Sequence, residues 1–244
     1  MNILPNLVAN WPAPSNVHAL TTTRSPGYSQ KSYAHNNLAL HVDDDPTHVH
    51  ANRAALIETL ALPTAPSWLE QTHSTVCVTV EDESNRYADA AVTRQSGQPL
   101  AILTADCLPI VLCDKQGTEV AAIHAGWRGL MNGIIENTLT KMKSPSNQLM
   151  AWIGLAICLS CYETGLEVKQ AFTERYAFTQ QAFQHRDGRL YADLPKMAEL
   201  VLHTLGVSSV YQSGACTFES ENAFYSYRRE AQTGRIATLI WFTT

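Results

Sequence analysis

Two residues with reactive side chains interrupt apolar stretches in the middle of this sequence. Cys107 follows the apolar run 99–105, and His124 ends the apolar run 120–123. A polar group in a buried strand is costly unless it has a partner or a purpose. Cysteine and histidine are both ligands of Zn²⁺, and together they also form the nucleophile and base of thiol enzymes. The pair therefore indicates either a metal site or a thiol-based active site.

A third candidate ligand, His73, lies at a polar bend within the segment 65–80. If the strand ends converge, His73, Cys107 and His124 supply three ligands. Zinc sites with three protein ligands are typically catalytic, because the fourth position stays open. Ligands this far apart match no local zinc signature, however. The alternative is a Cys107 nucleophile with His124 as its base and Asp106 as the carboxylate that orients the base.

The elements that would position these residues alternate between strands and helices. We expect a helix to begin at Asp45-Pro46, because aspartate caps a helix and proline suits its first position. The turn after His124 should start a helix that runs to about 143, with Gly126 and Gly129 serving either anion binding or close packing. We expect further helices over 165–176 and 193–205, a linker over 178–189, and strands at 18–24, within 65–80, and at 149–155, 208–216, 223–229 and 236–242.

This order of elements keeps no strict strand–helix–strand repeat. It predicts an α+β fold in which mixed β-sheets pack face to face with helices on the outside. The chain of 244 residues is long enough to bury a sizeable core. We expect a single compact domain over residues 1–244.

The six cysteines are expected to be reduced thiols rather than a disulfide framework. Cys158-Leu-Ser-Cys161 has the spacing of a redox or zinc motif. A structural zinc needs a second ligand pair, however, and none is visible in the sequence. We therefore favour no function for this pair.

Composition excludes several classes of function. Seventeen basic and 22 acidic residues give a net charge of −5 without a Lys/Arg cluster, so nucleic acid is not an expected partner. The first positively charged side chain is Arg24, so the charged start of a secretory signal is missing, and no apolar stretch reaches the roughly 18 residues of a membrane span. We expect a cytoplasmic protein with no membrane partner.

Four motifs carry a family resemblance. They are Trp68-Leu-Glu-Gln71-Thr-His73, Thr104-Ala-Asp-Cys107-Leu-Pro, Ala121-Ala-Ile-His124-Ala-Gly-Trp-Arg-Gly129 and Phe224-Tyr-Ser-Tyr-Arg-Arg229. In this order they resemble the YfiH family, which is also labelled laccase-domain, multicopper polyphenol oxidase or peptidoglycan editing factor. The resemblance extends from about residue 21 to residue 242. It implies a monomeric, zinc-dependent purine nucleoside phosphorylase that also acts on methylthioadenosine and deaminates adenosine.

The resemblance also implies roles for individual residues. It makes His73, Cys107 and His124 the ligands of Zn²⁺, with copper as a less favoured ion. The small-molecule partners would be a nucleoside and phosphate, and arginines suit phosphate because a guanidinium fork matches its oxygens. The candidates are Arg24, Arg53, Arg128 and Arg228 for phosphate, Asn37, Gln71 and Tyr227 for other substrate contacts, and Asp106 for a catalytic or turn-capping role.

Three other functions stay open at this point. The first is copper-dependent phenol oxidation, but multicopper oxidases need many His-X-His pairs, and the nine histidines here form one, His48-Val-His50. The second is hydrolysis of an amide in a cell-wall precursor by the same site. The third is a binding or scaffold protein whose zinc is structural.

Overall fold

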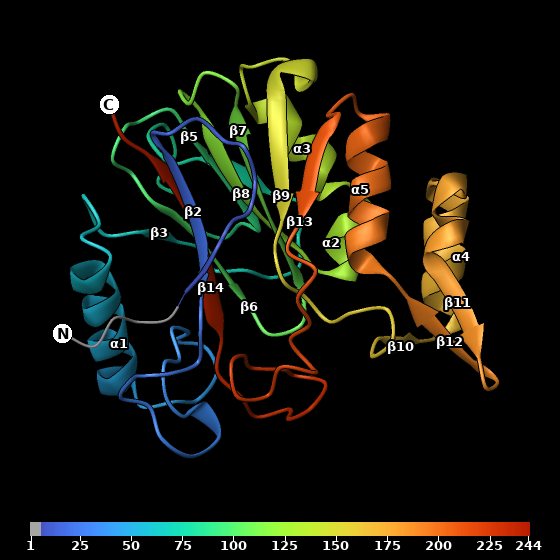
Figure 1. The fold of residues 1–244 in the computed structure, drawn as a ribbon, viewed down its shortest axis with the longest axis horizontal. Helices are drawn as coiled ribbons and strands as arrows, with labels where there is room; N and C mark the ends of the chain where they lie inside the picture. Colours follow the sequence, from blue (N-terminus) through green and yellow to red (C-terminus); the bar gives the residue numbers. More distant parts are fainter. Residues whose placement is uncertain (1–5) are drawn as a thin grey trace.

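The computed structural model describes residues 6–244 and contains two β-sheets that pack face to face (Figure 1). The first sheet has five strands in the order β1-β2-β14-β6-β3, and all its pairs are antiparallel except β3–β6. Its strands are β1 (Asn6–Val8), β2 (Val17–Thr22), β14 (Ile236–Phe242), β6 (Leu100–Thr104) and β3 (Ser67–Trp68).

The second sheet has six strands in the order β13-β9-β7-β8-β5-β4. Its four central strands are antiparallel, and a parallel strand is added at each edge. Its strands are β13 (Ser209–Gln212), β9 (Leu149–Ile153), β7 (Leu108–Asp114), β8 (Val120–Ala125), β5 (Ala90–Thr93) and β4 (Cys77–Thr79).

Helices cover the outer faces of both sheets (Figure 1). Asp45 caps the first helix by accepting a hydrogen bond from Thr47 N, as the Asp-Pro motif predicts. No helix among the described residues combines the length and the apolar character that crossing a membrane requires. The helices are α1 (Pro46–Thr59), α2 (Trp127–Asn132), α3 (Ile134–Lys141), α4 (Leu166–Arg175) and α5 (Leu194–Thr204), with short 3-10 turns at Lys31–Tyr33 (η1), Ser146–Gln148 (η2) and Ala177–Ala182 (η3).

The apolar core forms three layers between these elements. Ile102 of β6 and Trp152 of β9 belong to the cluster between the two sheets. Leu56 of α1 packs in the cluster outside the five-stranded sheet, and Ile134 of α3 and Val201 of α5 pack in the cluster outside the six-stranded sheet. Helix, sheet, sheet and helix therefore follow one another, and the predicted α+β arrangement of face-to-face mixed sheets with outer helices is confirmed.

Three predicted elements differ from the structure. The helix after His124 is split into α2 and α3, because Gly133 has φ = 100°, a left-handed conformation that glycine adopts at little cost. The predicted linker over 178–189 is wrong, because it contains η3, β11 (Phe183–Arg186) and the start of β12 (Arg189–Ala192), which form a small sheet with β10 (Glu163–Thr164).

The third difference is the strand predicted over 223–229, which is also wrong. The backbone there turns instead of joining a sheet. Arg228 N and Ser226 Oγ both donate hydrogen bonds to the Asp106 carboxylate, at 2.7 and 2.9 Å. Hydrogen bonds to the Asp106 carboxylate thus hold this segment, where a neighbouring strand would hold a strand in a sheet.

Candidate metal centre and substrate cavity

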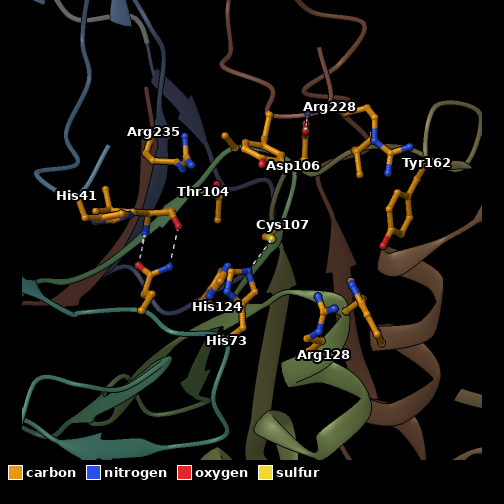
Figure 2. A pocket seen from close by; sticks show the side chains of 16 residues that line it. His41, His73, Thr104, Asp106, Cys107, His124, Arg128, Tyr162, Arg228 and Arg235 are labelled. Carbon is orange, nitrogen blue, oxygen red and sulfur yellow. Dashed lines mark hydrogen bonds between the residues drawn. The ribbon is translucent and has the colours of Figure 1, made fainter. Parts of the chain in front are cut away.

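The donor atoms of His73, Cys107 and His124 lie within 4.8 Å of one another at the centre of Figure 2. Cys107 Sγ is 3.6 Å from His73 Nε2. Two ligands of a tetrahedral zinc, with bonds of about 2.3 Å to sulfur and about 2.0 Å to nitrogen, lie roughly 3.5 Å apart. The structure therefore brings the three predicted ligands to one place, at a separation that suits a single ion.

Two of these residues lie in connections that cross from one sheet to the other. His73 belongs to the connection from β3 to β4, and Cys107 to the connection from β6 to β7, whereas His124 lies within β8. His73 has φ = 61°, and Asp106, just before Cys107, has φ = 89°. Such conformations cost non-glycine residues about 1–3 kcal/mol and persist only where surrounding contacts hold them.

Asp89 holds both histidines in place. The side chain is fully buried between β4 and β5, and its Oδ1 accepts hydrogen bonds from His124 Nδ1 at 2.7 Å and from His73 N at 3.0 Å. Its Oδ2 accepts from Thr72 N and from both the backbone N–H and the hydroxyl of Ser74. The bond to Nδ1 leaves His124 Nε2 available to a metal ion, as in carboxylate–histidine–zinc arrangements.

Charge within this cluster favours an ionised thiol. Burial opposes ionisation of Cys107, but hydrogen bonds to His124 and His73 outweigh it and lower the pKa of this thiol to about 6. Burial likewise opposes the charged form of His124, but Asp89 and Cys107 raise the pKa of this imidazole to about 9. A divalent cation replaces the imidazole proton when it binds, so the cluster combines a ready thiolate with a carboxylate-oriented imidazole.

Gly126 allows the His73 ring to approach the start of α2. A Cβ at this position would lie 2.6 Å from His73 Cδ2 and 3.3 Å from Cys107 Sγ. The first of these distances is shorter than carbon atoms tolerate, so only glycine fits without moving a ligand. Of the two roles considered for Gly126, this geometry supports close packing.

The cluster opens into a cavity of about 490 Å³, a volume typical of small-molecule sites (Figure 2). Three arginines, Arg128, Arg228 and Arg235, line it. Among the described lining residues Asp106 is the one carboxylate. The wall is therefore positively charged and suits an anionic ligand. The aromatic residues that line the cavity are Trp127, Tyr162 and Tyr227.

Asp106 connects the cluster to the C-terminal loop. Its Oδ1 accepts a hydrogen bond from Thr217 Oγ1 at 2.5 Å, and its Oδ2 accepts from Ser226 Oγ and Arg228 N. Within residues 6–244 its partners are thus two hydroxyls and a backbone N–H, and no histidine. The structure therefore places Asp106 as a cap for the loop that carries Tyr227 and Arg228, which agrees with the turn-capping role considered from the sequence.

Three of the predicted substrate-binding residues lie outside the cavity lining, and each forms hydrogen bonds elsewhere in the protein. Arg24 donates to Ala34 O and stacks on Tyr225. Arg53 donates to Leu38 O and stacks on the Trp68 ring at 4.0 Å. Asn37 is fully buried and accepts from Arg235 N. The structure thus shows these three residues in contact with other loops of the chain, and their contact with substrate stays a prediction.

The other predicted residues do line the cavity. Gln71 is among them, but its amide pairs with both backbone groups of Leu103 at 2.8 Å, which fixes its orientation on β6. Arg128 stacks on Trp127, and Arg228 donates to Glu163 O. Tyr227 is 56% exposed at the mouth.

Sequence reasoning missed several lining residues, of which Arg235 and Thr104 matter most. Arg235 follows a Thr-Gly turn, and its Nη1 is held by Thr233 O and Gly234 O. The sequence feature that could have identified Arg235 is its position directly after this turn and before a buried strand. The Thr104 hydroxyl is buried and finds no hydrogen-bond partner among the residues that the structure describes. Nothing in the sequence distinguishes it from a core threonine.

The fold and this site together define an α+β sandwich protein with a histidine–cysteine–histidine cluster at the base of a cationic cavity. A family model described as multi-copper polyphenol oxidoreductase laccase matches residues 18–243. The chain belongs to this laccase-domain family, also called the YfiH family.

Relatives of known name and structure cover almost the whole chain. A Pseudomonas aeruginosa protein named purine nucleoside phosphorylase is 44% identical, over 96% of this chain and 97% of its own length. The Escherichia coli protein named purine nucleoside phosphorylase YfiH is 39% identical, over 96% of this chain and 98% of its own length. A crystal structure of a Neisseria meningitidis protein, 42% identical, matches with a TM-score of 0.93 over 98% of this chain and 99% of that one.

Proposed function

We propose that this protein is a zinc-dependent purine nucleoside phosphorylase that also deaminates adenosine. Its substrates would be adenosine, inosine, guanosine or methylthioadenosine together with phosphate, and phosphorolysis would give the free base and ribose 1-phosphate or its methylthio analogue. The observation that carries the proposal is the His73, Cys107 and His124 cluster at the base of an arginine-lined cavity. The names of the relatives support the same reaction class.

The arginines would hold the phosphate. Arg128 comes from α2, Arg228 from the C-terminal loop and Arg235 from the position just before β14, so their guanidinium groups approach the cavity from three sides (Figure 2). Guanidinium groups bind phosphate oxygens in pairs of hydrogen bonds. The oxygens of the Asp106 carboxylate already accept hydrogen bonds from Thr217, Ser226 and Arg228 N, so its negative charge is stabilised by these groups and the three arginines would outweigh it.

The aromatic residues would hold the base. Tyr162 and Tyr227 stand on the side of the cavity that carries Arg228, and a purine has two faces on which a ring can stack. Deamination would take place at the purine C6, where water adds and ammonia leaves, whereas phosphate would attack the sugar carbon that bears the base, so one cavity would hold the nucleoside for both reactions.

The donor set fits Zn²⁺. One thiolate and two imidazoles are ligands that zinc prefers, and three protein ligands leave room for substrate or water. When bound, the ion would polarise an adjacent substrate atom or activate water. The chain contributes the orientation: Asp89 fixes the His124 tautomer, and Gly126 lets the His73 ring lie against Cys107.

The test is turnover of the pure, zinc-loaded protein. Inosine and adenosine are incubated with and without phosphate, and free base, ribose 1-phosphate and inosine are separated by chromatography. We expect free base only with phosphate, and inosine from adenosine in either case. Absence of phosphate-dependent free base would overturn the phosphorylase assignment, and absence of inosine would overturn the deaminase assignment.

Two variants sharpen this test. Arg235→Gln should lower kcat/KM for phosphate about 10- to 100-fold, because a hydrogen bond to a charged group contributes about 1.5–3 kcal/mol. Arg175→Gln is the matched control, since Arg175 pairs with Glu136 away from the cavity lining and should leave turnover unchanged. Equal effects of the two variants would contradict the phosphate role. The same preparations, given a phenol with copper or a cell-wall precursor, test the two other enzyme assignments.

A further inference from the structure

A second group of metal-binding side chains lies outside the cavity lining. The donor atoms of Cys158, Cys161, Cys216 and Glu219 all lie within 4.8 Å of one another, and all three cysteines are free thiols. The sequence shows Cys158-Leu-Ser-Cys161 without a second ligand pair. The structure supplies that pair as Cys216-Thr-Phe-Glu219, which has the same two-residue spacing. The geometry points to a second zinc site, formed by these four residues and distinct from the site in the cavity.

The distances suit a tetrahedral ion. Cys161 Sγ lies 3.6 Å from Glu219 Oε1. A zinc ion with a bond of about 2.3 Å to sulfur and about 2.1 Å to oxygen holds these atoms roughly 3.6 Å apart. Ser160 Oγ lies 3.0 Å from Cys158 Sγ and 3.3 Å from Glu219 Oε1, so a hydroxyl borders the same space.

Backbone contacts hold the two ligand pairs together without any ion. Cys158 N donates to Cys216 Sγ at 3.3 Å, and Thr217 N donates to Ala156 O at 3.1 Å. Ala156 and Cys216 also form an isolated parallel bridge. An N–H group directed at sulfur stabilises the thiolate that a metal requires. The ligands are therefore arranged in advance rather than gathered by chance on a flexible surface.

Two arginines offset the negative charge of such a site. Three thiolates and one carboxylate around Zn²⁺ carry a net charge of about −2. Arg186 Nη2 donates to Ser160 O in the first pair, and Arg229 Nη1 donates to Thr217 O and Phe218 O in the second. Each ligand pair thus has a cation bound to its own backbone.

The donor set indicates the ion and its role. Soft thiolates select zinc over magnesium or calcium, and four protein ligands make a closed, structural site. Cys216 is buried, whereas Glu219 is exposed, which leaves a path for the ion to enter. Each zinc bound here displaces the protons of the three thiols.

Because of its position, the second zinc site would stabilise part of the cavity wall. Cys161 is followed by Tyr162, which lines the cavity, and Cys216 is followed by Thr217, whose hydroxyl binds Asp106. An ion that joins the two pairs would fix Tyr162 of the cavity wall and, through Thr217, the Asp106 carboxylate. This role does not depend on which reaction the cavity performs.

The test counts metal ions in the full-length protein. The chain is stripped with a chelator under reducing conditions, reloaded with Zn²⁺, and analysed by mass spectrometry of the metal. We expect two zinc ions per wild-type chain, and one each for Cys107→Ser and for the double variant Cys158→Ser, Cys161→Ser. One zinc per wild-type chain, lost with Cys107→Ser, would overturn the proposal. So would a mass 2 Da lower for the protein kept without reductant than for the reduced protein, because that difference indicates a disulfide.

Two further variants distinguish the loss of a zinc ligand from misfolding of the chain. Cys77→Ala removes a buried cysteine outside both clusters and should retain two zinc ions. Glu219→Gln changes an exposed side chain, so the fold should survive while zinc in the second site passes to a chelator at least about tenfold faster. Cobalt bound to Cys107→Ser should show the thiolate absorption of a tetrahedral site. A Glu219→Gln protein that keeps the wild-type exchange rate would contradict the proposal.

Discussion

Asp89 holds two of the three candidate ligands, His73 and His124, although it does not line the cavity. All the hydrogen bonds recorded at its carboxylate can be donated by its partners: three backbone N–H groups of residues 72–74, the Ser74 hydroxyl and His124 Nδ1. Although burial favours the protonated form, the bonds from His124 and Ser74 hold the pKa of Asp89 below its usual value. A single buried charge thus sets both the ring of His124 and the backbone of His73.

Replacing Asp89 by asparagine should therefore weaken metal binding. The asparagine amide would direct its own N–H groups at donors, which costs about 1–3 kcal/mol of stability. Loss of the carboxylate beside a ligating histidine typically lowers metal affinity about 10- to 100-fold. Competition with a chelating dye measures the affinity of the cavity site, and calorimetry measures the stability.

Asp114→Asn is the matched control for this prediction. Asp114 is also buried, and it accepts from Thr118 N, the Thr118 hydroxyl and Glu119 N at the far end of β7. This variant should lose stability to a similar extent but keep its zinc affinity. If both variants lose affinity equally, the effect of Asp89 is one of stability alone.

The reactive residues of the site could be selected from the sequence, but their partners could not. Cys107 and His124 stand out because they interrupt apolar runs. Asp89 does not, because it follows an ordinary loop and its partners lie 15 to 35 positions away. Arg53 and Arg235 show the same limit of prediction from sequence alone. Residue type suits both for phosphate, but only the folded chain shows that Leu38 O already binds Arg53.

At the scale of the elements, the junction between β8 and α2 controls how closely the site packs. Gly126 is the N-cap of α2, and the Cβ of any larger residue would meet the His73 ring. Gly126→Ala should displace His73 and cost about 1–3 kcal/mol of zinc binding, or roughly 5- to 150-fold in affinity. Zinc competition measures this directly, and phosphorolysis should fall in parallel.

Gly165→Ala serves as the control, because Gly165 is likewise the N-cap of a helix, α4. Both changes carry the same capping cost. The added Cβ at 165 would meet only the end of the exposed Glu167 side chain, which can move away. Zinc affinity should stay at the wild-type value. An equal loss in both variants would mean that helix capping, rather than the His73 contact, explains the effect.

Helices and buried strands were predictable where one physical signal dominated. Asp45-Pro46 marked the start of α1, and the apolar run 236–242 marked β14. The hairpin of β11 and β12 was missed because residues 184–186 are polar and exposed, so no alternation between apolar and polar residues revealed it. Residues 223–229 were assigned as a strand because aromatic residues favour strands, yet Asp106 binds that segment as a turn.

At the scale of the whole molecule, the candidate metal centre lies where the chain passes between its two sheets. The connections β3–β4 and β6–β7 each leave the five-stranded sheet and enter the six-stranded one, and they carry His73 and Cys107. His124 belongs to the six-stranded sheet. An ion bound by all three residues therefore joins both crossovers to the second sheet.

Zinc should accordingly stabilise the entire fold. At a free concentration about 100 times the dissociation constant, one ion in the cavity site adds about 2.7 kcal/mol. For a chain of this length, each kcal/mol raises Tm by about 2–4 °C, so the expected rise from this site is about 5–10 °C, and the second cluster would add its own part. The rise should shrink at pH 5, because protons compete for His124, whose pKa is about 9, and for Cys107, whose pKa is about 6. Scanning calorimetry of the chelated and reloaded protein measures the shift in Tm.

Two variants separate the contributions of the two clusters. Cys107→Ser should keep only the part of the Tm rise that is due to the second cluster, and Cys107→Ser combined with Cys161→Ser should abolish the rise. A full shift in that double variant would show that zinc stabilises the protein elsewhere.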